Sequence, residues 1–488
     1  MSKDVVDAAK VAVHPQATGT PADAGDAGYS KDLKSRHVNM IAIGGAIGTG
    51  LLLGAGGRLH TAGPALALAY LVCGVFAFFV VRALGELVLY RPSSGSFVSY
   101  AREFLGEKGA YVAGWMYFLN WSTTGIADIT AIALYTHYWS MFTPIPQWVL
   151  ALIALAVVLA VNLISVKIFG EMEFWFAIVK VATIVGFMAI GIFLLATQHK
   201  VGAHAPGLSV ISDHGGLFPH GMMPAVLVMQ GVIFAYAALE LVGVAAGETA
   251  EPQKVVPRAV NSIMWRVGLF YVGSVVLLAL LLPGSVYSAA QSPFVTVLSS
   301  IGVPAAGDVM NLVVLTAAMS SLNSGLYSTG RILRSMAMAG SAPKFTARMN
   351  RSQVPYGGIL LTCGVCVLGV VLNYLVPEQA FEIVLEIASL GIISTWVIIM
   401  LCHMVFVRRA KQGLVTRPNF RLKGSPVTEI VTIAFLLVCL GMMWNDPEVG
   451  RKTLLLIPVI AVALVAGWFG VRRRVARNAD QELGELTK

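Results

Sequence analysis

A run of glycines at residues 44–50, with the sequence GGAIGTG, carries the strongest chemical signal in this chain. It lies inside an apolar stretch from about Val38 to Ala55, close to the roughly 20 residues needed to cross a bilayer. Each glycine disfavours a helix by about 1 kcal/mol, and non-helical backbone at membrane depth occurs where it is packed in protein or lines a cavity. Exposed N–H groups at a half-helix start suit a carboxylate, and free carbonyl oxygens suit an ammonium. The pattern predicts a transport site for a small zwitterion.

A single lysine, Lys180, lies within the apolar residues 172–196. A lysine in the middle of a membrane costs about 2.5–3.5 kcal/mol on insertion scales, and burial disfavours its charged form. Gain and loss of a proton at Lys180 could therefore couple transport to a proton gradient. The alternative is a lysine whose long side chain reaches the cytosolic interface.

A second interruption is predicted in the apolar run that contains residues 230–243, which ends in Glu240-Leu241-Val242-Gly243. A carboxylate at this depth is costly unless it is paired or protonated. Glu240 is therefore predicted either to bind a proton during transport or to tie its helix to neighbouring helices.

Polar side chains form a row on a third apolar run. Asn120, Thr124 and Asp128 follow i, i+4, i+8 spacing and would share one helix face. They offer the donors and acceptors that a side-chain amide needs, although polar contacts between helices would explain them equally well. A further polar group could complete the pocket or support Lys180, and it consists of Ser320, Ser321, Asn323 and Ser324.

Arg82 and Glu86 are also four residues apart, so the sequence predicts a helical ion pair with a structural role.

The composition indicates what kind of domain positions these residues. The chain has 488 residues, of which 57% are hydrophobic and 12% charged, against about 25% charged in an average soluble protein. It therefore reads as one membrane domain. The net charge of +9 does not indicate nucleic-acid binding, because the basic residues are dispersed between apolar runs. The five cysteines all lie in apolar stretches and suggest neither disulfides nor a metal site.

Twelve apolar runs have membrane-spanning length. With the N-terminus in the cytosol, 28 of the 34 lysine and arginine residues fall on the cytosolic side, counting Arg266, Arg331 and Arg334 near the cytosolic ends of their spans. Four lie outside, and Arg82 and Lys180 are counted within spans. This excess predicts that both termini lie on the cytosolic side of the membrane. The approximate spans are 37–57, 64–89, 109–140, 147–166, 172–196, 221–246, 262–283, 306–337, 356–376, 381–405, 427–445 and 453–471.

The two interrupted runs are spans one and six, so they take matching places if ten spans form two five-span halves of inverted orientation. The expected organisation is a disordered cytosolic tail (1–35), a first half (36–205), a second half (206–405), spans eleven and twelve (406–472) and a cytosolic tail (473–488).

Short motifs along nearly the whole chain carry a family resemblance. They are GGAIGTG at 44–50, RALGEL at 82–87, RPSSGSF at 91–97, EFWF at 173–176, ELVG at 240–243 and AGET at 246–249. Together they resemble the bacterial amino acid transporter family of the amino acid–polyamine–organocation superfamily. The motifs GWMYF at 114–118 and LNSGLY at 322–327 are most similar to those of members that carry L-asparagine.

The resemblance implies an all-α, twelve-span transporter with the leucine-transporter-like inverted repeat, spans one and six unwound, and two extra C-terminal helices. It implies proton-coupled import of L-asparagine by alternating access, with no cofactor besides the proton gradient. Lys180 would stand where sodium-coupled cousins hold an ion.

The resemblance also implies the ligands of the amino acid. Ile47, Gly48, Thr49 and Gly50 would meet the α-carboxylate, and the carbonyl groups of Ala46, Phe234 and Ala237 would meet the α-ammonium, with the Phe234 ring covering the substrate. Close helix packing by small residues is the competing explanation for the first group, and a core or lipid-facing aromatic is the alternative for Phe234.

Other functions stay open at this level. Another substrate, such as γ-aminobutyrate or an aromatic or other neutral amino acid, would use the same pocket, as would an amino acid receptor that does not transport. An enzyme is not expected, because no nucleophile–base pair or metal cluster is suitably placed. The expected partners are the amino acid, the proton and the lipid bilayer, and the sequence carries no signal for an oligomeric state.

Overall fold

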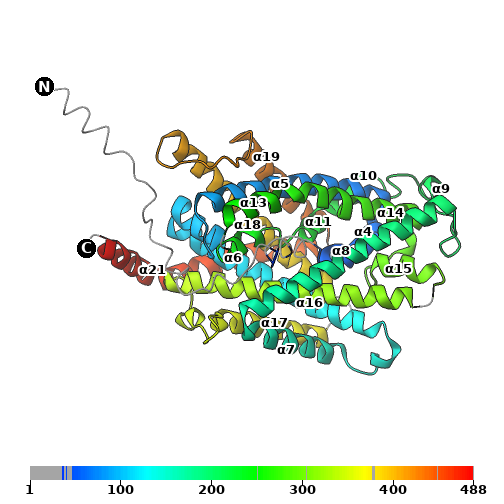
Figure 1. Cartoon of the computed structure of the whole chain (residues 1–488), viewed down its shortest axis with the longest axis horizontal. Helices are drawn as coiled ribbons and strands as arrows, with labels where there is room; N and C mark the ends of the chain where they lie inside the picture. The colour runs from blue at the N-terminus through cyan, green and yellow to red at the C-terminus, as the bar shows by residue number, and fades with distance from the viewer. Residues whose placement is uncertain are drawn as a thin grey trace.

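The computed structural model describes residues 36–37, 40, 47–249, 251–303, 305–375, 380–447 and 449–486. These residues form a bundle of helices with no β-strand among them. Most of the long helices run along the longest axis of the molecule (Figure 1). The predicted N-terminal tail, 1–35, lies outside the described residues.

The first part of the bundle contains both long helices and short helical segments. The elements are α3 (Thr49–Leu52), α4 (Ala55–Ala62), η2 (Gly63–Ala65), α5 (Leu66–Tyr90), α6 (Ser96–His137), η3 (Ser140–Phe142), α7 (Gln147–Ile164), α8 (Val166–Thr197), α9 (Leu208–Ser212), α10 (Met222–Leu227), α11 (Met229–Ala235) and α12 (Leu241–Ala246).

The second part continues with longer helices. The elements are α13 (Pro252–Arg266), the π-helical η4 (Val267–Gly273), α14 (Ser274–Leu281), η5 (Gly284–Val286), α15 (Pro293–Ser300), α16 (Ala306–Met338), η6 (Lys344–Ala347), α17 (Tyr356–Leu375), α18 (Ala380–Lys411), α19 (Val427–Met442), η7 (Met443–Asn445), α20 (Gly450–Leu454) and α21 (Leu456–Leu486).

Local sequence explains several helix limits. The Ser165 side chain accepts a hydrogen bond from the Ile168 N–H at 3.2 Å and caps the start of α8. Between α4 and α5 the chain turns at Gly63, whose φ of +61° suits a residue without a side chain, and Pro64 follows.

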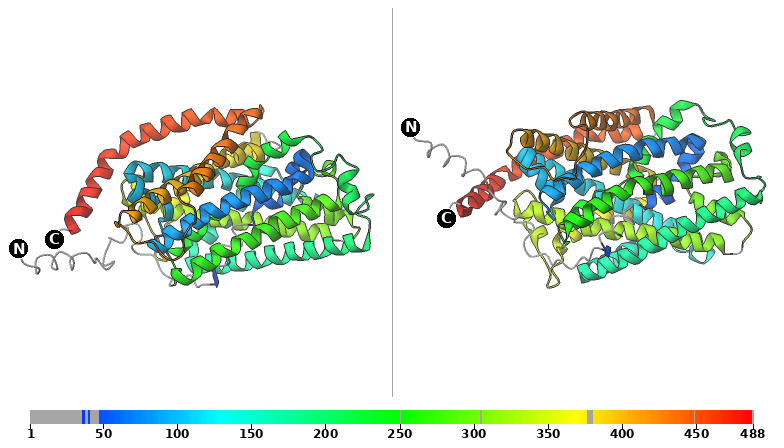
Figure 2. Two further views of the ribbon diagram at one scale, coloured as in Figure 1. Left: turned by 90° about the horizontal axis from the view of Figure 1, so that it is seen from above. Right: turned by 45° about the horizontal axis from the view of Figure 1, so that its top comes forward.

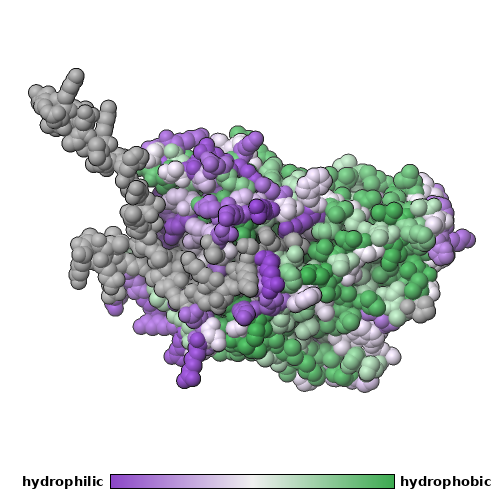
Figure 3. Space-filling model, in the orientation of Figure 1, coloured by the Kyte–Doolittle hydropathy of each residue, from purple (hydrophilic) through white to green (hydrophobic). Residues whose placement is uncertain are grey.

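Nine helical stretches among the described residues are long and apolar enough to cross a membrane. They correspond to nine of the twelve predicted spans. Hydrophobic residues cover much of the surface along these helices, while hydrophilic residues gather toward one end (Figure 3). The chain is thus a multi-pass, all-helical membrane protein, as the composition predicts.

The three remaining predicted spans fall short for identifiable reasons. Span one (37–57) lies partly outside the described residues and is represented by short helices. Span three (109–140) lies in α6, whose polar row reduces its hydropathy. Span six (221–246) is divided into α10, α11 and α12.

The core of the bundle surrounds α18 and α6. Within the most apolar window of α18, 72% of the residues are buried, against none in the corresponding window of α21. Gly391 of α18 allows this close packing, because a Cβ there would lie 2.6 Å from Asn120 Cβ of α6. In contrast, α21 lies on the outside of the bundle, and its C-terminal end projects beyond it (Figure 1, Figure 2).

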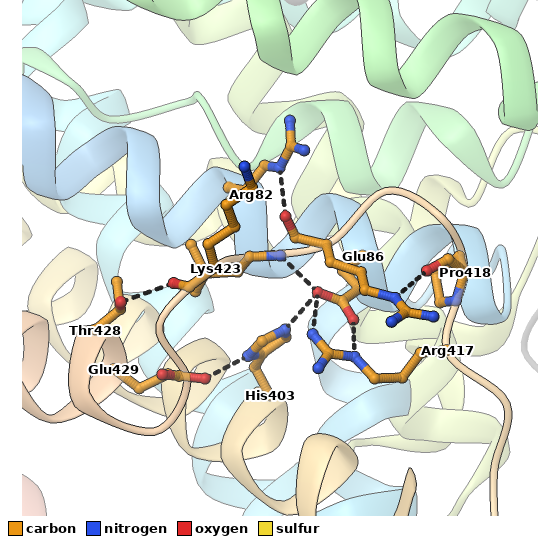
Figure 4. Close-up of polar contacts among 10 residues, drawn as sticks. Arg82, Glu86, His403, Arg417, Pro418, Lys423, Thr428 and Glu429 are labelled. Atoms are coloured by element: carbon orange, nitrogen blue, oxygen red, sulfur yellow. Dashed lines mark hydrogen bonds and ion pairs between the residues drawn. The ribbon is translucent and has the colours of Figure 1, made fainter. Parts of the chain in front are cut away.

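A buried ionic cluster joins α5, α18 and α19 to the loop between the last two (Figure 4). The Glu86 carboxylate accepts hydrogen bonds from Arg417 Nε (2.6 Å), His403 Nε2 (3.0 Å) and the Leu422 N–H (2.7 Å). His403 Nδ1 contacts Glu429 Oε1 at 2.7 Å. Because both ring nitrogens face carboxylates, both donate and the ring is an imidazolium. Two positive charges thereby balance two buried negative ones.

The predicted pairing of Arg82 with Glu86 is wrong. Arg82 donates instead to Asn261 Oδ1 (2.6 Å) and to the Arg421 carbonyl (3.1 Å). Its guanidinium also lies over the Phe420 ring, 3.5 Å from the ring centroid. Glu86 points to the partners described above, which are more than 300 residues away in sequence.

Candidate functional site

The helix of predicted span six is broken at residues 236–240. Three hydrogen bonds between residues three apart replace the regular ladder here. They run from the Tyr236 N–H to the Ile233 carbonyl (3.0 Å), from the Ala237 N–H to the Phe234 carbonyl (2.9 Å) and from the Leu241 N–H to the Ala238 carbonyl (3.1 Å). Ala238 has a φ of +74°, which an L-residue adopts only under local constraint. The break thus leaves carbonyl groups without regular helical partners.

The start of α3 faces this break. Gly48 is extended, with φ −120° and ψ −167°, and α3 begins at Thr49. A Cβ on Gly50 would lie 2.6 Å from Ala235 Cα, so the backbones of α3 and α11 are in direct contact. The predicted ligand Ala46 lies outside the described residues. Ile47, Thr49, Gly50 and Phe234 are buried, whereas Gly48 is partly exposed.

Two of the predicted site residues, Thr49 and Asp128, are joined by a hydrogen bond. The Thr49 hydroxyl donates to Asp128 Oδ1 at 3.0 Å, and both side chains are buried. Ser321 of α16 lies beside the same carboxylate. Asp128 Oδ2 has no hydrogen-bond partner among the described residues. Asp128 therefore joins α6 to α3 and retains one acceptor oxygen.

Lys180 belongs to a buried polar chain that crosses from α8 to α16. Its ammonium donates to Ser320 Oγ (2.8 Å), and the Ser320 hydroxyl donates to Glu173 Oε2 (2.7 Å). Asn323 Nδ2 donates to the other oxygen of Glu173 at 2.7 Å. Lys180 also feels the charge of Asp128, so it lies between two carboxylates rather than at the membrane interface.

Glu240 occupies a separate position at the far end of the break. It is buried, and neither carboxylate oxygen has a hydrogen-bond partner among the described residues. The Trp396 indole and the Tyr117 phenol are among its neighbours. The two predicted proton-binding residues, Lys180 and Glu240, thus lie in different surroundings.

Asn120 and Thr124 are not brought to the Thr49–Asp128 contact. The Thr124 hydroxyl donates to Asn120 Oδ1 at 3.3 Å, within α6 itself. Asn120 packs against Gly391 of α18, about 12 Å along the helix from Asp128. Ala237 lies in the turn of the broken segment and is partly exposed.

A cavity of about 680 Å³ lies next to the site, with Gly54, Gln230, Gly231 and Glu386 in its lining. None of the predicted substrate-binding residues that the structure describes lines it. The buried side chain of Arg58 lies between the cavity and the start of α3. It lines the cavity and donates a hydrogen bond to the Gly50 carbonyl at 2.9 Å. Arg58 therefore separates the cavity from the contact between α3 and α11.

Sequence reasoning missed two residues of this region. Glu173 lies on the same face of α8 as Lys180, two helical turns before it. This spacing of opposite charges within one apolar span could have predicted that the two residues interact. Arg58 follows the apolar stretch and carries no sequence signal of burial. No group of His, Cys, Asp and Glu that could hold a metal ion occurs among the described residues.

The arrangement offers backbone dipoles from two interrupted segments and a buried lysine–carboxylate chain beside them. The first can hold a charged ligand, and the second can exchange a proton. Neither requires a covalent step.

Comparison with known proteins gives concordant results. The model of a family described as amino acid permease matches residues 37–480. The chain is similar to the L-asparagine permease of Streptomyces coelicolor, with 86% identity over 483 residues and 99% of each chain covered. It is 62% identical over 454 residues to the L-asparagine permease of Salmonella typhimurium, covering 93% of this chain and 91% of that one. The L-asparagine permease of Escherichia coli K12 is 60% identical with the same coverage.

Proposed function

Since the chain belongs to the amino acid permease family and is a transporter rather than an enzyme, we propose that it imports L-asparagine together with protons by alternating access. The observation that supports L-asparagine as the substrate is the similarity, over more than nine-tenths of the chain, to permeases named for L-asparagine. At such identity the pocket residues are expected to be largely shared.

The two charged ends of asparagine would be held by backbone groups. Ile47, Gly48 and Gly50 lie at the start of α3, where helical N–H groups favour an anion. The carbonyls of Ala46, Phe234 and Ala237 would accept the α-ammonium. The Thr49 hydroxyl has one hydrogen and donates it to Asp128, so the carboxylate would be held mainly by N–H groups.

The side-chain amide needs both a donor and an acceptor. Asp128 Oδ2 and the Ser321 hydroxyl are the nearest groups to Thr49 that could serve it. Asn120 and Thr124 would contribute only if the helices rearrange during transport, since they now bond to each other.

Proton coupling would use the buried chain of Lys180, Ser320 and Glu173. With Asp128 included, one positive charge faces two carboxylates. A buried group with a net negative charge is costly, so one proton is favoured there. Glu240 offers a second buried carboxyl group without partners. Binding and release of these protons would alter the charges around the substrate.

The proposed architecture is twelve spans with two inverted halves, 36–205 and 206–405, followed by spans eleven and twelve. Support comes from interruptions at corresponding positions, at the start of α3 and at residues 236–240. The excess of lysine and arginine on one side would place both termini in the cytosol of a bacterial inner membrane, with the hydrophilic end of Figure 3 on the cytosolic side.

The test is uptake by the purified protein in liposomes. Labelled L-asparagine should accumulate when the outside is more acidic than the inside, and a protonophore should abolish accumulation. Unlabelled asparagine should compete better than γ-aminobutyrate or aromatic amino acids. Uptake that is equal with and without the gradient would contradict proton coupling, and stronger competition by another amino acid would contradict the substrate.

A further inference from the structure

A second cavity lies at the hydrophilic end of the molecule, between α16, η6 and α21. Its volume is about 480 Å³, within the range of roughly 300–1,000 Å³ typical of small-ligand sites. It is lined by Ala337, Lys344, Gly470, Arg473, Arg474, Arg477 and Asn478. It is remote from the transport site and plays no part in the function proposed above.

Four of the lining residues are cations: Lys344, Arg473, Arg474 and Arg477. None of them has an ion pair or hydrogen bond with another described residue, and no carboxylate of the part of the chain that the structure describes lines the cavity. Four positive charges around one hollow repel one another unless an anion is present. This differs from Arg36, Arg91, Arg331 and Arg417 of the same chain, which pair with carboxylates.

The walls of the cavity are fixed by packing contacts. Asn478 Nδ2 donates to the Met338 carbonyl at 3.0 Å, which ties α21 to the end of α16. Gly340 lets α21 approach, since a Cβ there would lie 3.1 Å from Arg474 Cγ. The three arginines therefore lie on a helix that is hydrogen-bonded to the end of α16, against which η6, the element of Lys344, also packs.

The cavity adjoins an apolar surface that faces outward. Val459, Val462, Val465 and Phe469 of α21 are exposed, and the arginines follow Phe469 within a few residues. A ligand with a negative head and long apolar chains would match a cationic cavity that adjoins an apolar surface.

From these observations we infer that the cavity binds the headgroup of an anionic phospholipid, whose phosphate contacts Arg473, Arg474, Arg477 and Lys344 and whose acyl chains lie along α21. A phosphate is the group that arginine recognises through several donors at once. The lipid, rather than soluble phosphate, is the occupant because the apolar surface continues directly from the cationic one.

The test uses the purified full-length protein in detergent, titrated with phosphatidylglycerol and followed by native mass spectrometry. The triple variant Arg473→Gln, Arg474→Gln, Arg477→Gln should bind phosphatidylglycerol at least tenfold more weakly than the unchanged protein. The triple Arg→Lys variant at these positions, which keeps the charges, should retain most of the binding.

The matched control removes three exposed cations outside the cavity, by Arg258→Gln, Arg351→Gln and Lys411→Gln. It should change phosphatidylglycerol binding less than twofold. Equal losses in both Gln triples, or no loss in either, would overturn the site. Phosphatidylcholine bound as tightly as phosphatidylglycerol would overturn the anionic specificity. Displacement of phosphatidylglycerol by millimolar inorganic phosphate would show that a soluble anion, not a lipid, is the occupant.

Discussion

The Thr49 hydroxyl donates a hydrogen bond to Asp128 Oδ1 at 3.0 Å, which fastens the first residue of α3 to the C-terminal part of α6. Both groups are buried. The contact lies beside Ser321 and within the electric field of Lys180. A change in the charge of Asp128 would therefore be felt at the start of the helix proposed to hold the substrate carboxylate.

Removing this hydroxyl should impair transport. Thr49→Val keeps the shape but leaves a buried carboxylate oxygen without its donor, at a cost of about 1–3 kcal/mol. We expect asparagine uptake to fall at least tenfold in liposomes. Thr49→Ser, which keeps the donor, should stay within about threefold of the unchanged protein. Equal uptake by the Val and Ser variants would show that the bond has no role.

Lys180→Met should separate exchange from accumulation. Without the ammonium, Glu173 and Asp128 lose the cation between them, so proton-driven accumulation should be abolished while counterflow of labelled asparagine persists. Lys200→Met, at an exposed lysine, is the matched control and should accumulate normally. Full accumulation by Lys180→Met would remove this lysine from the mechanism.

Glu240→Gln should flatten the pH dependence of uptake. The amide is a permanently neutral replacement for a carboxyl group whose two oxygens are buried without partners. Initial uptake rates measured from pH 5 to 8 should vary less than in the unchanged protein, whereas Glu251→Gln, at an exposed position, should follow the original profile. A Glu240→Gln profile that superimposes on the original would exclude proton binding at this residue.

His403→Leu should destabilise the protein. It leaves Glu429 without its ring partner and removes one of the two cations that balance Glu86 (Figure 4). Breaking a buried pair in this way costs about 3–5 kcal/mol, so the melting temperature in detergent should fall. Adding Glu429→Gln should recover part of the loss because it removes the uncompensated charge. An unchanged melting temperature for His403→Leu would contradict the imidazolium assignment.

The sequence was informative where local rules operate. Span lengths followed from apolar runs, and α7 begins at the predicted Gln147. The break in span six was predicted more from its position than from its composition, since only Gly231 and Gly243 lie within residues 230–243. The helix α13 begins at Pro252, ten residues before the predicted span seven, because its first turns are amphipathic rather than apolar.

Long-range pairing was beyond the sequence. Spacing alone suggested Arg82 for Glu86, but the fold brings His403 and Arg417 closer, and no local rule ranks partners so distant in the chain. Arg58 directly follows predicted span one (37–57), where an exposed loop residue is expected, yet its side chain is buried and donates to the Gly50 carbonyl. Which buried polar groups meet is decided by helix packing, as for Ser320 between Lys180 and Glu173.

The central claim is that asparagine binds beside the start of α3, and Gly48→Ala tests it most directly. No atom of the described residues lies within 4 Å of a Cβ built at Gly48, and alanine tolerates its extended backbone. The added methyl group should fill the substrate's space without disturbing the fold.

Binding of labelled L-asparagine to the purified protein is the measurement, with Gly441→Ala as control because its Cβ also meets open space. The account predicts that Gly48→Ala weakens binding at least tenfold at an unchanged melting temperature, while Gly441→Ala binds normally. Normal asparagine binding by Gly48→Ala would contradict it.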